Sequence, residues 1–435
     1  MPVPMNSSAG AAAIDSAQWP RIAQLPAGRF DRLRARFAEA EFARACARGD
    51  VRLTDGELTV HEDALFTRIA HDGWLGVAES YMAGEWSTKD SDALVDVLRK
   101  LLQAGYHPRA KTPRREPDSG GEIPLSLLER YSGDGITGYG GVFASGMATT
   151  SRTSVESFAP GAGRGGEPKS HFVDVSVYDP PTRIDREDLR AAQHRATQLL
   201  LDAAEVSAGT HLLVIPGAGL PVAIQAAKRR ATVDVLTADL EFRSAITDTA
   251  IYEGVSDSVH CAVIDKPVPG PQEWRGRYDA IAVIDKLPLA SAAQRRALIN
   301  GLDRMLAPGG RVVVRSTIAS DALNGAGAAS LAGLREYIWP GLKYPTTRDV
   351  HRLVDKNSSL RIIAEVHTGT HAAESLAMQR SFFSGQLREA AASGYDVVFR
   401  RLWMFQLALR EALLREEMLD TVAFTAVRRN RGGRR

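Results

Sequence analysis

Residues 209–227 read GTHLLVIPGAGLPVAIQAA, and the expected fold follows from this stretch. Four apolar residues, 212–215, run into a glycine cluster at Gly217 and Gly219, and an alanine-rich segment of helical character follows. A continuous apolar run is typical of a buried parallel strand, and a glycine turn that leads into a helix is the nucleotide-binding half of a Rossmann-like unit. The same pattern fits an ordinary strand–turn–helix unit that binds nothing, because Pro216 removes a backbone donor from the turn.

Apolar runs and helical periodicity alternate along the rest of this half of the chain. A helix is expected from an N-cap at Asp185, and another over 396–419. Strands are expected at 212–215, 233–236, 259–264, 280–284, 312–314 and 422–427. Such alternation predicts an α/β fold with a mostly parallel, doubly wound, seven-stranded sheet, whose last strand runs antiparallel at an edge.

The N-terminal quarter of the chain has a different pattern. Phe30, Leu33 and Phe37 follow helical spacing within 29–48, and residues 92–103 (DALVDVLRKLLQ) form a clear amphipathic helix pattern. Asp55-Gly56 between apolar residues predicts a hairpin with a type I′ turn. These features predict a small helical domain that carries a hairpin.

Composition narrows the class of protein. The 435 residues carry 54 basic and 52 acidic side chains, a net charge of +2, so no global field points to nucleic acid as a partner. Cys46 and Cys261 lie far apart, so we expect neither a disulfide framework nor a metal site. The N-terminus lacks the order of a signal peptide, and no apolar run approaches a membrane span. We therefore expect a cytoplasmic protein.

One string in the helical part is distinctive. Residues 76–86 read GVAESYMAGEW, ahead of the 92–103 helix, and this string resembles the N-terminal domain of the cyclopropane-fatty-acyl-phospholipid synthase family. Residues 13–26 are similar to actinobacterial members, and residues 337–341 (YIWPG) and 371–376 (HAAESL) resemble later family motifs. The resemblance covers almost the whole chain except 106–180. By its own composition, the aromatic and Met cluster in the string is more typical of a core than of a lipid contact.

This resemblance implies a class I S-adenosylmethionine-dependent methyltransferase core and gives the expected domain plan. The expected segments are a flexible N-terminus (1–27), an N-terminal helical domain that binds lipid or a partner (28–105), a Gly/Pro-rich linker or active-site cover (106–180), a methyltransferase-like Rossmann domain (181–430) and a basic tail (431–435).

The resemblance also implies a reaction. Family enzymes transfer a methyl group from S-adenosylmethionine to the double bond of unsaturated phospholipid acyl chains, and a bicarbonate held by Cys, Glu, His and Tyr side chains accepts the proton. In this chain Pro288, Arg315 and Ala372 occupy three of those positions, and neither cysteine is in place. His371 and Glu374 remain as catalytic candidates, although a lone His there fits a structural role equally well.

The changed positions suggest how the anion site is filled. Asp285 is the nearest acidic neighbour of Arg315 in the expected site, and we expect the two side chains to pair there. An Arg315–Asp285 pair would occupy the position that the family's anion takes.

The cofactor residues implied by the fold are more complete. Gly217 and Gly219 would border S-adenosylmethionine, Asp239 lies where an acid would bind the ribose hydroxyls, and Asp265 ends the third strand near the adenine position. Asp at a strand end is also a common turn former, so a purely structural role for Asp239 and Asp265 stays open.

Two functions remain open, and both concern lipid acyl-chain modification. The first is a degenerate copy of the family, with weak or no classical activity, that binds lipid or an active homologue. The second is an active S-adenosylmethionine-dependent methyltransferase on fatty acyl chains with altered site chemistry. The expected partners are phospholipid acyl chains or the inner face of the membrane, and a homo-oligomer or a hetero-oligomer with an active homologue.

Overall fold

The computed structural model describes residues 14–26, 31–53, 57–109, 140–164, 167–182, 184, 188–215, 219–266, 268–270 and 276–429. The chain divides into two compact units. Unit 1 comprises Met1–Glu116, Asp321–Ile338 and Leu376–Met418, and unit 2 comprises Pro117–Ser320, Trp339–Ser375 and Leu419–Arg435.

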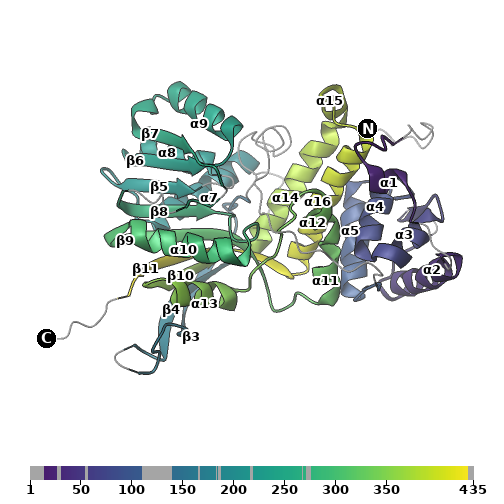
Figure 1. The fold of residues 1–435 in the computed structure, drawn as a ribbon, viewed down its shortest axis with the longest axis horizontal. Helices are drawn as coiled ribbons and strands as arrows, with labels where there is room; N and C mark the ends of the chain where they lie inside the picture. The colour runs from purple at the N-terminus through teal and green to yellow at the C-terminus, as the bar shows by residue number, and fades with distance from the viewer. Residues whose placement is uncertain are drawn as a thin grey trace. The chain divides into compact units, whose positions relative to one another are not determined.

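Unit 2 is built on a mixed, mostly parallel sheet (Figure 1). Its strands are β3 (Ala148–Glu156), β4 (Ser170–Tyr178), β5 (His211–Ile215), β6 (Thr232–Thr237), β7 (Val259–Val263), β8 (Tyr278–Ile284), β9 (Leu306–Ala319), β10 (Leu360–His367) and β11 (Leu419–Arg428). The order across the nine-stranded sheet is β3-β4-β10-β11-β9-β8-β5-β6-β7. The predicted α/β fold is confirmed, and β5, the strand that decided it, lies between β8 and β6.

The last strand is antiparallel, as predicted, but its expected place at an edge is wrong. β11 pairs with β9 on one side and with β10 on the other, antiparallel to both. A strand lies at an edge only when no other strand pairs with its second side. The sequence of β11 alone does not show whether such a partner exists. Val422, Phe424 and Ala426, buried on one face of β11, suit an internal strand.

The two faces of the sheet are covered by different helices. The helices of unit 2 are α7 (Leu189–Ala203), α8 (Leu220–Lys228), α9 (Leu240–Tyr252), the short 3₁₀ helix η2 (Ser256–Ser258), α10 (Ala292–Met305) and α13 (Thr347–Asn357). One apolar core joins α7, α8 and α9 to the sheet, and a second joins α10 and α13 to the opposite face. Strand β5 contributes Leu212 and Val214 to the first core and Leu213 and Ile215 to the second, which explains its unbroken apolar run.

Part of the stretch expected to be a linker or cover belongs to the sheet. Strands β3 and β4 pair antiparallel, and β4 then pairs in parallel with β10, so the sheet has two strands more than expected. β3 (ATTSRTSVE) is almost entirely polar and exposed, so it lacks the apolar signature of a buried strand. β4 (SHFVDVSVY) alternates valines with polar residues, and its composition is that of a strand. Residues 110–139 of the same stretch lie outside the described part of the chain.

Unit 1 is helical. Its elements are α1 (Pro20–Ala23), α2 (Asp31–Arg48), α3 (Ala64–Asp72), α4 (Trp74–Ala83), α5 (Ser91–Gln103), α11 (Gly325–Ser330), α12 (Ala332–Tyr337), α15 (Leu387–Ala392), α16 (Val397–Arg415) and the short strands β1 (Thr59–Val60) and β2 (Trp86–Ser87). α14 (Gly369–Gly385) begins in unit 2 and ends in unit 1. Unit 1 also includes α11, α12 and α16 from the C-terminal half of the chain, which pack with α4 or α5.

The Asp55-Gly56 turn of the predicted hairpin lies outside the described residues, and the Leu58 N–H donates to the Arg52 carbonyl oxygen across it. Thr59 and Val60 of β1 pair with Ser87 and Trp86 of β2. The predicted helices at 29–48 and 92–103 correspond to α2 and α5. Within the described residues, no helix is long and apolar enough to cross a membrane.

The distinctive GVAESYMAGEW string builds the centre of unit 1. A Cβ on Gly76 would lie 2.3 Å from the backbone of Arg68, so α3 and α4 approach at a distance that only glycine permits. The buried Arg68 donates from Nε to Glu85 Oε1 over 2.9 Å, and Arg21 donates from Nε to Glu79 Oε1 over 2.7 Å. Trp86 donates from Nε1 to the carbonyl oxygen of Val77. The string is therefore core, as its composition predicted.

Candidate functional site

Three of the predicted cofactor residues lie just after the carboxyl ends of neighbouring strands. Gly219 precedes α8 after β5, Asp239 follows β6, and Asp265 follows β7. Thr237 at the end of β6 is paired with Val263 at the end of β7, so Asp239 and Asp265 occupy equivalent positions on adjacent parallel strands. Ligands of open α/β sheets bind outside these carboxyl ends.

Asp239 has both a structural bond and an available acceptor. It is the N-cap of α9, where its Oδ1 accepts hydrogen bonds from the backbone N–H groups of Glu241 and Phe242, over 2.8 and 3.4 Å. Among the described residues no hydrogen-bond donor is assigned to its Oδ2. One oxygen thus fixes the carboxylate as the cap of α9, and the other is not used by the cap.

The remaining predicted cofactor residues are less informative. Asp265 is exposed, two residues past β7. Gly217 lies among residues 216–218, outside the described part of the chain, so the loop that it was expected to form is not described. Gly219 is the N-cap of α8 with φ near −99°, a conformation open to most residues. A glycine at this position would let a ligand approach the backbone closely, and it is not needed for the backbone conformation.

Arg315 and Asp285 form the ion pair that the sequence predicted. Arg315 lies on β9, and its Nη1 donates to Oδ2 of Asp285, directly after β8, over 2.9 Å. Its Nη2 donates to the carbonyl oxygen of Gly140 over 3.2 Å, and the Arg315 carbonyl accepts the backbone N–H of Asp285. The Arg315 side chain is 8% exposed and that of Asp285 is 26% exposed. The cation at this position is therefore neutralised by the protein's own carboxylate.

His371 has both ring nitrogens engaged. Nδ1 accepts the backbone N–H of Phe143 over 2.9 Å, and Nε2 donates to the carbonyl oxygen of Asp179 over 3.0 Å. A backbone N–H can only donate and a carbonyl can only accept, so these partners select one neutral tautomer. The fully buried ring holds two loop segments against α14, which favours its structural role. Glu374, the other candidate, is half-buried one turn further along the helix.

Residues 140–146 contribute to this site. Their sequence has no helical or strand periodicity that would have predicted this. Besides the Gly140 carbonyl, the Gly141 N–H donates to Ser375 Oγ over 2.8 Å, and a Cβ on Gly141 would lie 2.6 Å from the backbone of Ala192 in α7. The adjacent glycines were the only available signal, because close backbone approach requires residues without side chains.

Lys286 is a second feature that the sequence did not reveal. It follows Asp285 at the carboxyl end of β8 and is buried, 2% exposed. Burial lowers the pKa of its amine to about 7. Short loops after buried strands often carry charged residues to solvent, so only the tertiary structure shows that this one is enclosed.

A network of buried and half-buried titratable side chains joins α13, β10 and β11 in unit 2. His351 Nε2 lies 2.5 Å from Glu365 Oε1, Glu365 Oε2 lies 3.2 Å from His367 Nε2, and His367 Nδ1 lies 2.6 Å from Asp420 Oδ2. Burial alone would lower the pKa of His367, but hydrogen bonds and charges from Asp420 and Glu365 raise it to about 9. Burial alone would raise the pKa of Glu365, but His351 and His367 hold it at about 2.

This network predicts a pH dependence of stability. The stabilising contribution of charged His367 is complete below its ordinary pKa of about 6.5 and is lost as the pH rises towards 9. That of Glu365 is complete above its ordinary pKa of about 4.3 and is lost as the pH falls towards 2. Lys286, whose folded pKa is lowered, acts in the opposite sense above neutral pH.

The comparison of wild type with His367→Gln isolates the His367 contribution, because Lys286 affects both proteins equally. The difference in free energy of unfolding, measured by urea titration, should shrink between about pH 6.5 and pH 9. An unchanged difference over that range would contradict a charged His367.

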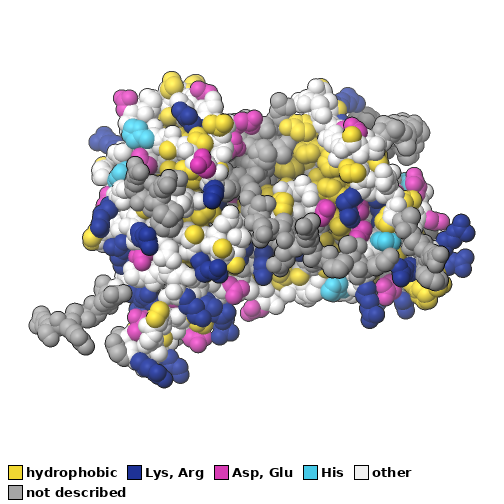
Figure 2. All heavy atoms as spheres, in the orientation of Figure 1, with side chains coloured by type: hydrophobic (Ala, Val, Ile, Leu, Met, Phe, Trp, Pro, Cys, Tyr) yellow, Lys and Arg dark blue, Asp and Glu magenta, His cyan; other side chains and the backbone are white. Residues whose placement is uncertain are grey.

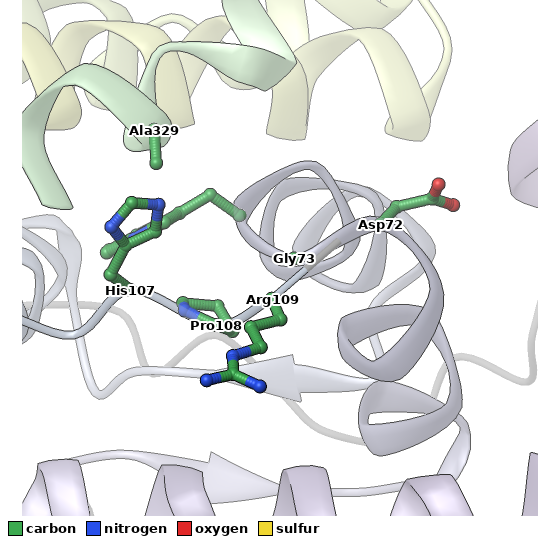
Figure 3. Close-up of a pocket in the computed structure, with 7 residues that line it drawn as sticks. Asp72, Gly73, His107, Pro108, Arg109 and Ala329 are labelled. Carbon is green, nitrogen blue, oxygen red and sulfur yellow. The ribbon is translucent and has the colours of Figure 1, made fainter. Parts of the chain in front are cut away.

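Unit 1 contains a pocket lined by its own residues. Its volume is about 410 Å³, and it is lined by Asp72, Gly73, Trp74, His107, Pro108, Arg109 and Ala329. Figure 3 shows the side chains of Asp72, His107 and Arg109 pointing in different directions rather than converging on one point. Asp72 also accepts a hydrogen bond from Arg21 over 3.1 Å. The pocket therefore lacks a set of polar groups that could act on one ligand.

Comparisons with known proteins agree with this architecture. Residues 178–424, more than half of the chain, match the family described as mycolic acid cyclopropane synthetase. Tuberculostearic acid methyltransferase UfaA1 of Mycobacterium tuberculosis (strain ATCC 25618 / H37Rv) is 27% identical over 448 residues, covering 97% of this chain and 98% of the relative.

Two solved structures complete the comparison. Coclaurine N-methyltransferase bound to N-methylheliamine and SAH is 12% identical, with a TM-score of 0.56 over 80% of this chain and 98% of that chain. Mycolic acid cyclopropane synthase CmaA1 complexed with SAH and CTAB is 17% identical, with a TM-score of 0.49 over 56% of this chain and 87% of that chain. The fold is that of class I S-adenosylmethionine-dependent methyltransferases, and the chain belongs to the mycolic acid cyclopropane synthetase family.

Proposed function

We propose that this protein acts in the modification of unsaturated phospholipid acyl chains as a copy of the family that binds lipid or an active homologue. On this proposal it transfers no methyl group by the bicarbonate chemistry that the family resemblance implies. The observation that carries the proposal is the ion pair between Arg315 and Asp285 at the position expected for the anion. The Asp285 carboxylate already neutralises the Arg315 guanidinium, so this cation offers little net attraction for a second anion.

The surroundings of the pair support the same function. His371, the retained catalytic candidate, has both ring nitrogens hydrogen-bonded to backbone groups. Pro288 and Ala372 carry no group that could hold an anion. A proton acceptor would therefore have to come from a residue that the family resemblance does not assign.

A second function is favoured by a separate observation. The similarity to a tuberculostearic acid methyltransferase runs through almost the whole of both chains. It supports an active S-adenosylmethionine-dependent methyltransferase on fatty acyl chains, with altered site chemistry. The two functions differ in one outcome, methyl transfer by this chain alone.

Cofactor binding can be tested apart from catalysis. Calorimetric titration with S-adenosylmethionine and S-adenosylhomocysteine is expected to show binding of both, because Asp239 retains a carboxylate oxygen for the ribose. Asp239→Asn keeps the helix cap and removes the charge, and loss of a hydrogen bond to a charged group should weaken binding by about 10- to 100-fold. Asp188→Asn, which changes the N-cap of α7, is the matched control and should leave the affinity unchanged. No heat of binding for either compound would remove the cofactor from the proposal.

A further inference from the structure

The outward face of α2 in unit 1 combines large apolar side chains with arginines. Leu33 is 56% exposed and Phe37 is 65% exposed, although both are large apolar residues. The inward face of the helix is satisfied: Ala38, Phe42, Ala45 and Cys46 are buried, and α2 packs on α3 and α5. Leu33 and Phe37 are therefore not exposed because the core beneath α2 is incomplete.

Arginines outnumber acids on that face. With about 100° between successive helical residues, Arg36, Arg44 and Arg48 lie within about 60° of Leu33, and the small Ala40 and Ala47 lie between them. Glu39 lies about 120° from Leu33, on one flank, whereas Glu41 lies one helical turn after Phe37, at the border of the face. All of these side chains are exposed. In Figure 2 hydrophobic and basic side chains also lie next to one another over the region of α2.

A second exposed apolar pair in the protein lacks this charge pattern. Ile251 is 63% exposed and Tyr252 is 87% exposed at the end of α9 in unit 2. Asp248 lies one helical turn before both, and the next residue, Glu253, is paired with Lys228. Each pair has an acid one helical turn away, so the difference of α2 lies in the number of arginines around Leu33 and Phe37.

We propose that the outward face of α2 docks on the surface of an anionic phospholipid bilayer, with Leu33 and Phe37 inserted among the headgroups and Arg36, Arg44 and Arg48 against lipid phosphates. Apolar side chains gain by leaving water at the interface, and guanidinium groups pair with phosphate in bidentate geometry. An anionic bilayer surface attracts arginines that lie close to it. The inference deepens the proposed function and rests on it for the bilayer being the source of the acyl chains.

The experiment is sedimentation of the full chain with lipid vesicles, without S-adenosylmethionine. Binding to phosphatidylcholine vesicles that contain phosphatidylglycerol is expected to exceed binding to phosphatidylcholine alone by about 100-fold at low salt, since each arginine at the surface contributes about fivefold. Arg36→Gln with Arg44→Gln should remove about 30-fold. Leu33→Ser with Phe37→Ser should lower binding to the anionic vesicles by at least about tenfold. Ile251→Ser with Tyr252→Ser is the matched control and should bind as the wild type does.

Each outcome decides the inference. Equal binding by wild type and the Leu33/Phe37 variant, or by anionic and neutral vesicles, would overturn it. So would concentration-dependent self-association in sedimentation velocity that the Leu33/Phe37 variant abolishes without any vesicle binding, because the occupant of the face would then be a second copy. Circular dichroism shows whether each variant is folded, and the arginine variants keep the inference testable if the serine variant is not. Because no methyl donor is present, a negative result here leaves cofactor binding and acyl-chain chemistry to their own tests.

Discussion

The purified protein alone is expected to transfer no detectable methyl group from labelled S-adenosylmethionine to oleoyl phospholipid. Loss of one well-placed electrostatic group from an active site costs about 10²–10³ in rate. Here the cysteine is not in place, and Pro288, Arg315 and Ala372 stand at the other three positions where the resemblance implies anion-holding groups. Effects within one site are not additive, but a single such loss already places the rate far below that of an active enzyme.

The assay needs three samples besides the wild type. An active family member in the same vesicles shows that the substrate is competent, and a mixture of the two proteins shows whether this chain alters the active one. Asp239→Ala removes the carboxylate expected at the ribose. Methyl transfer by this chain alone, abolished by Asp239→Ala, would contradict the proposed function and establish the active-enzyme alternative with a proton acceptor that the family resemblance does not assign.

Arg315→Gln is expected to destabilise unit 2 by about 3 kcal/mol. Removal of one partner of a buried pair leaves the other charge uncompensated, which typically costs 3–5 kcal/mol, and the lower end applies since 26% of the Asp285 side chain is exposed. The bond to the Gly140 carbonyl is lost in the same change. The measurement is the midpoint and slope of urea unfolding.

Two variants separate the ion pair from a general effect of the strand. Arg311 lies on the same strand and pairs with Glu205, whose side chain is 64% exposed, so Arg311→Gln should change stability by no more than about 1 kcal/mol. Arg315→Gln combined with Asp285→Asn should recover most of the loss, because no charge then remains uncompensated. Equal effects of Arg311→Gln and Arg315→Gln would show that the pair does not hold the site closed.

The sequence alone determined those helices and strands whose own residues show a clear apolar run or helical period. Strand β5 is buried on both faces, so its apolar run is unbroken and recognisable without any tertiary information. α5 alternates buried and exposed positions with helical period and begins at the N-cap Asp90. The Arg315–Asp285 pair could also be predicted, because Arg315 lies on β9, Asp285 directly follows the neighbouring parallel strand β8, and the resemblance aligned both residues with one site.

Only the tertiary structure decided which segments meet. β3 is polar because the outer end of a sheet is largely solvated, so nothing in its composition separates it from a loop. The valines of β4 suit a strand, but only the fold shows that it pairs with β3 and β10. The internal place of β11 and the packing of α16 with α4 and α5 depend on contacts between residues far apart in sequence. The same holds for His371: its motif was visible, but the backbone groups that occupy its two nitrogens come from positions 143 and 179, more than a hundred residues away. Burial, pairing and pKa are properties of the assembled neighbourhood, and a linear sequence specifies that neighbourhood only through the fold.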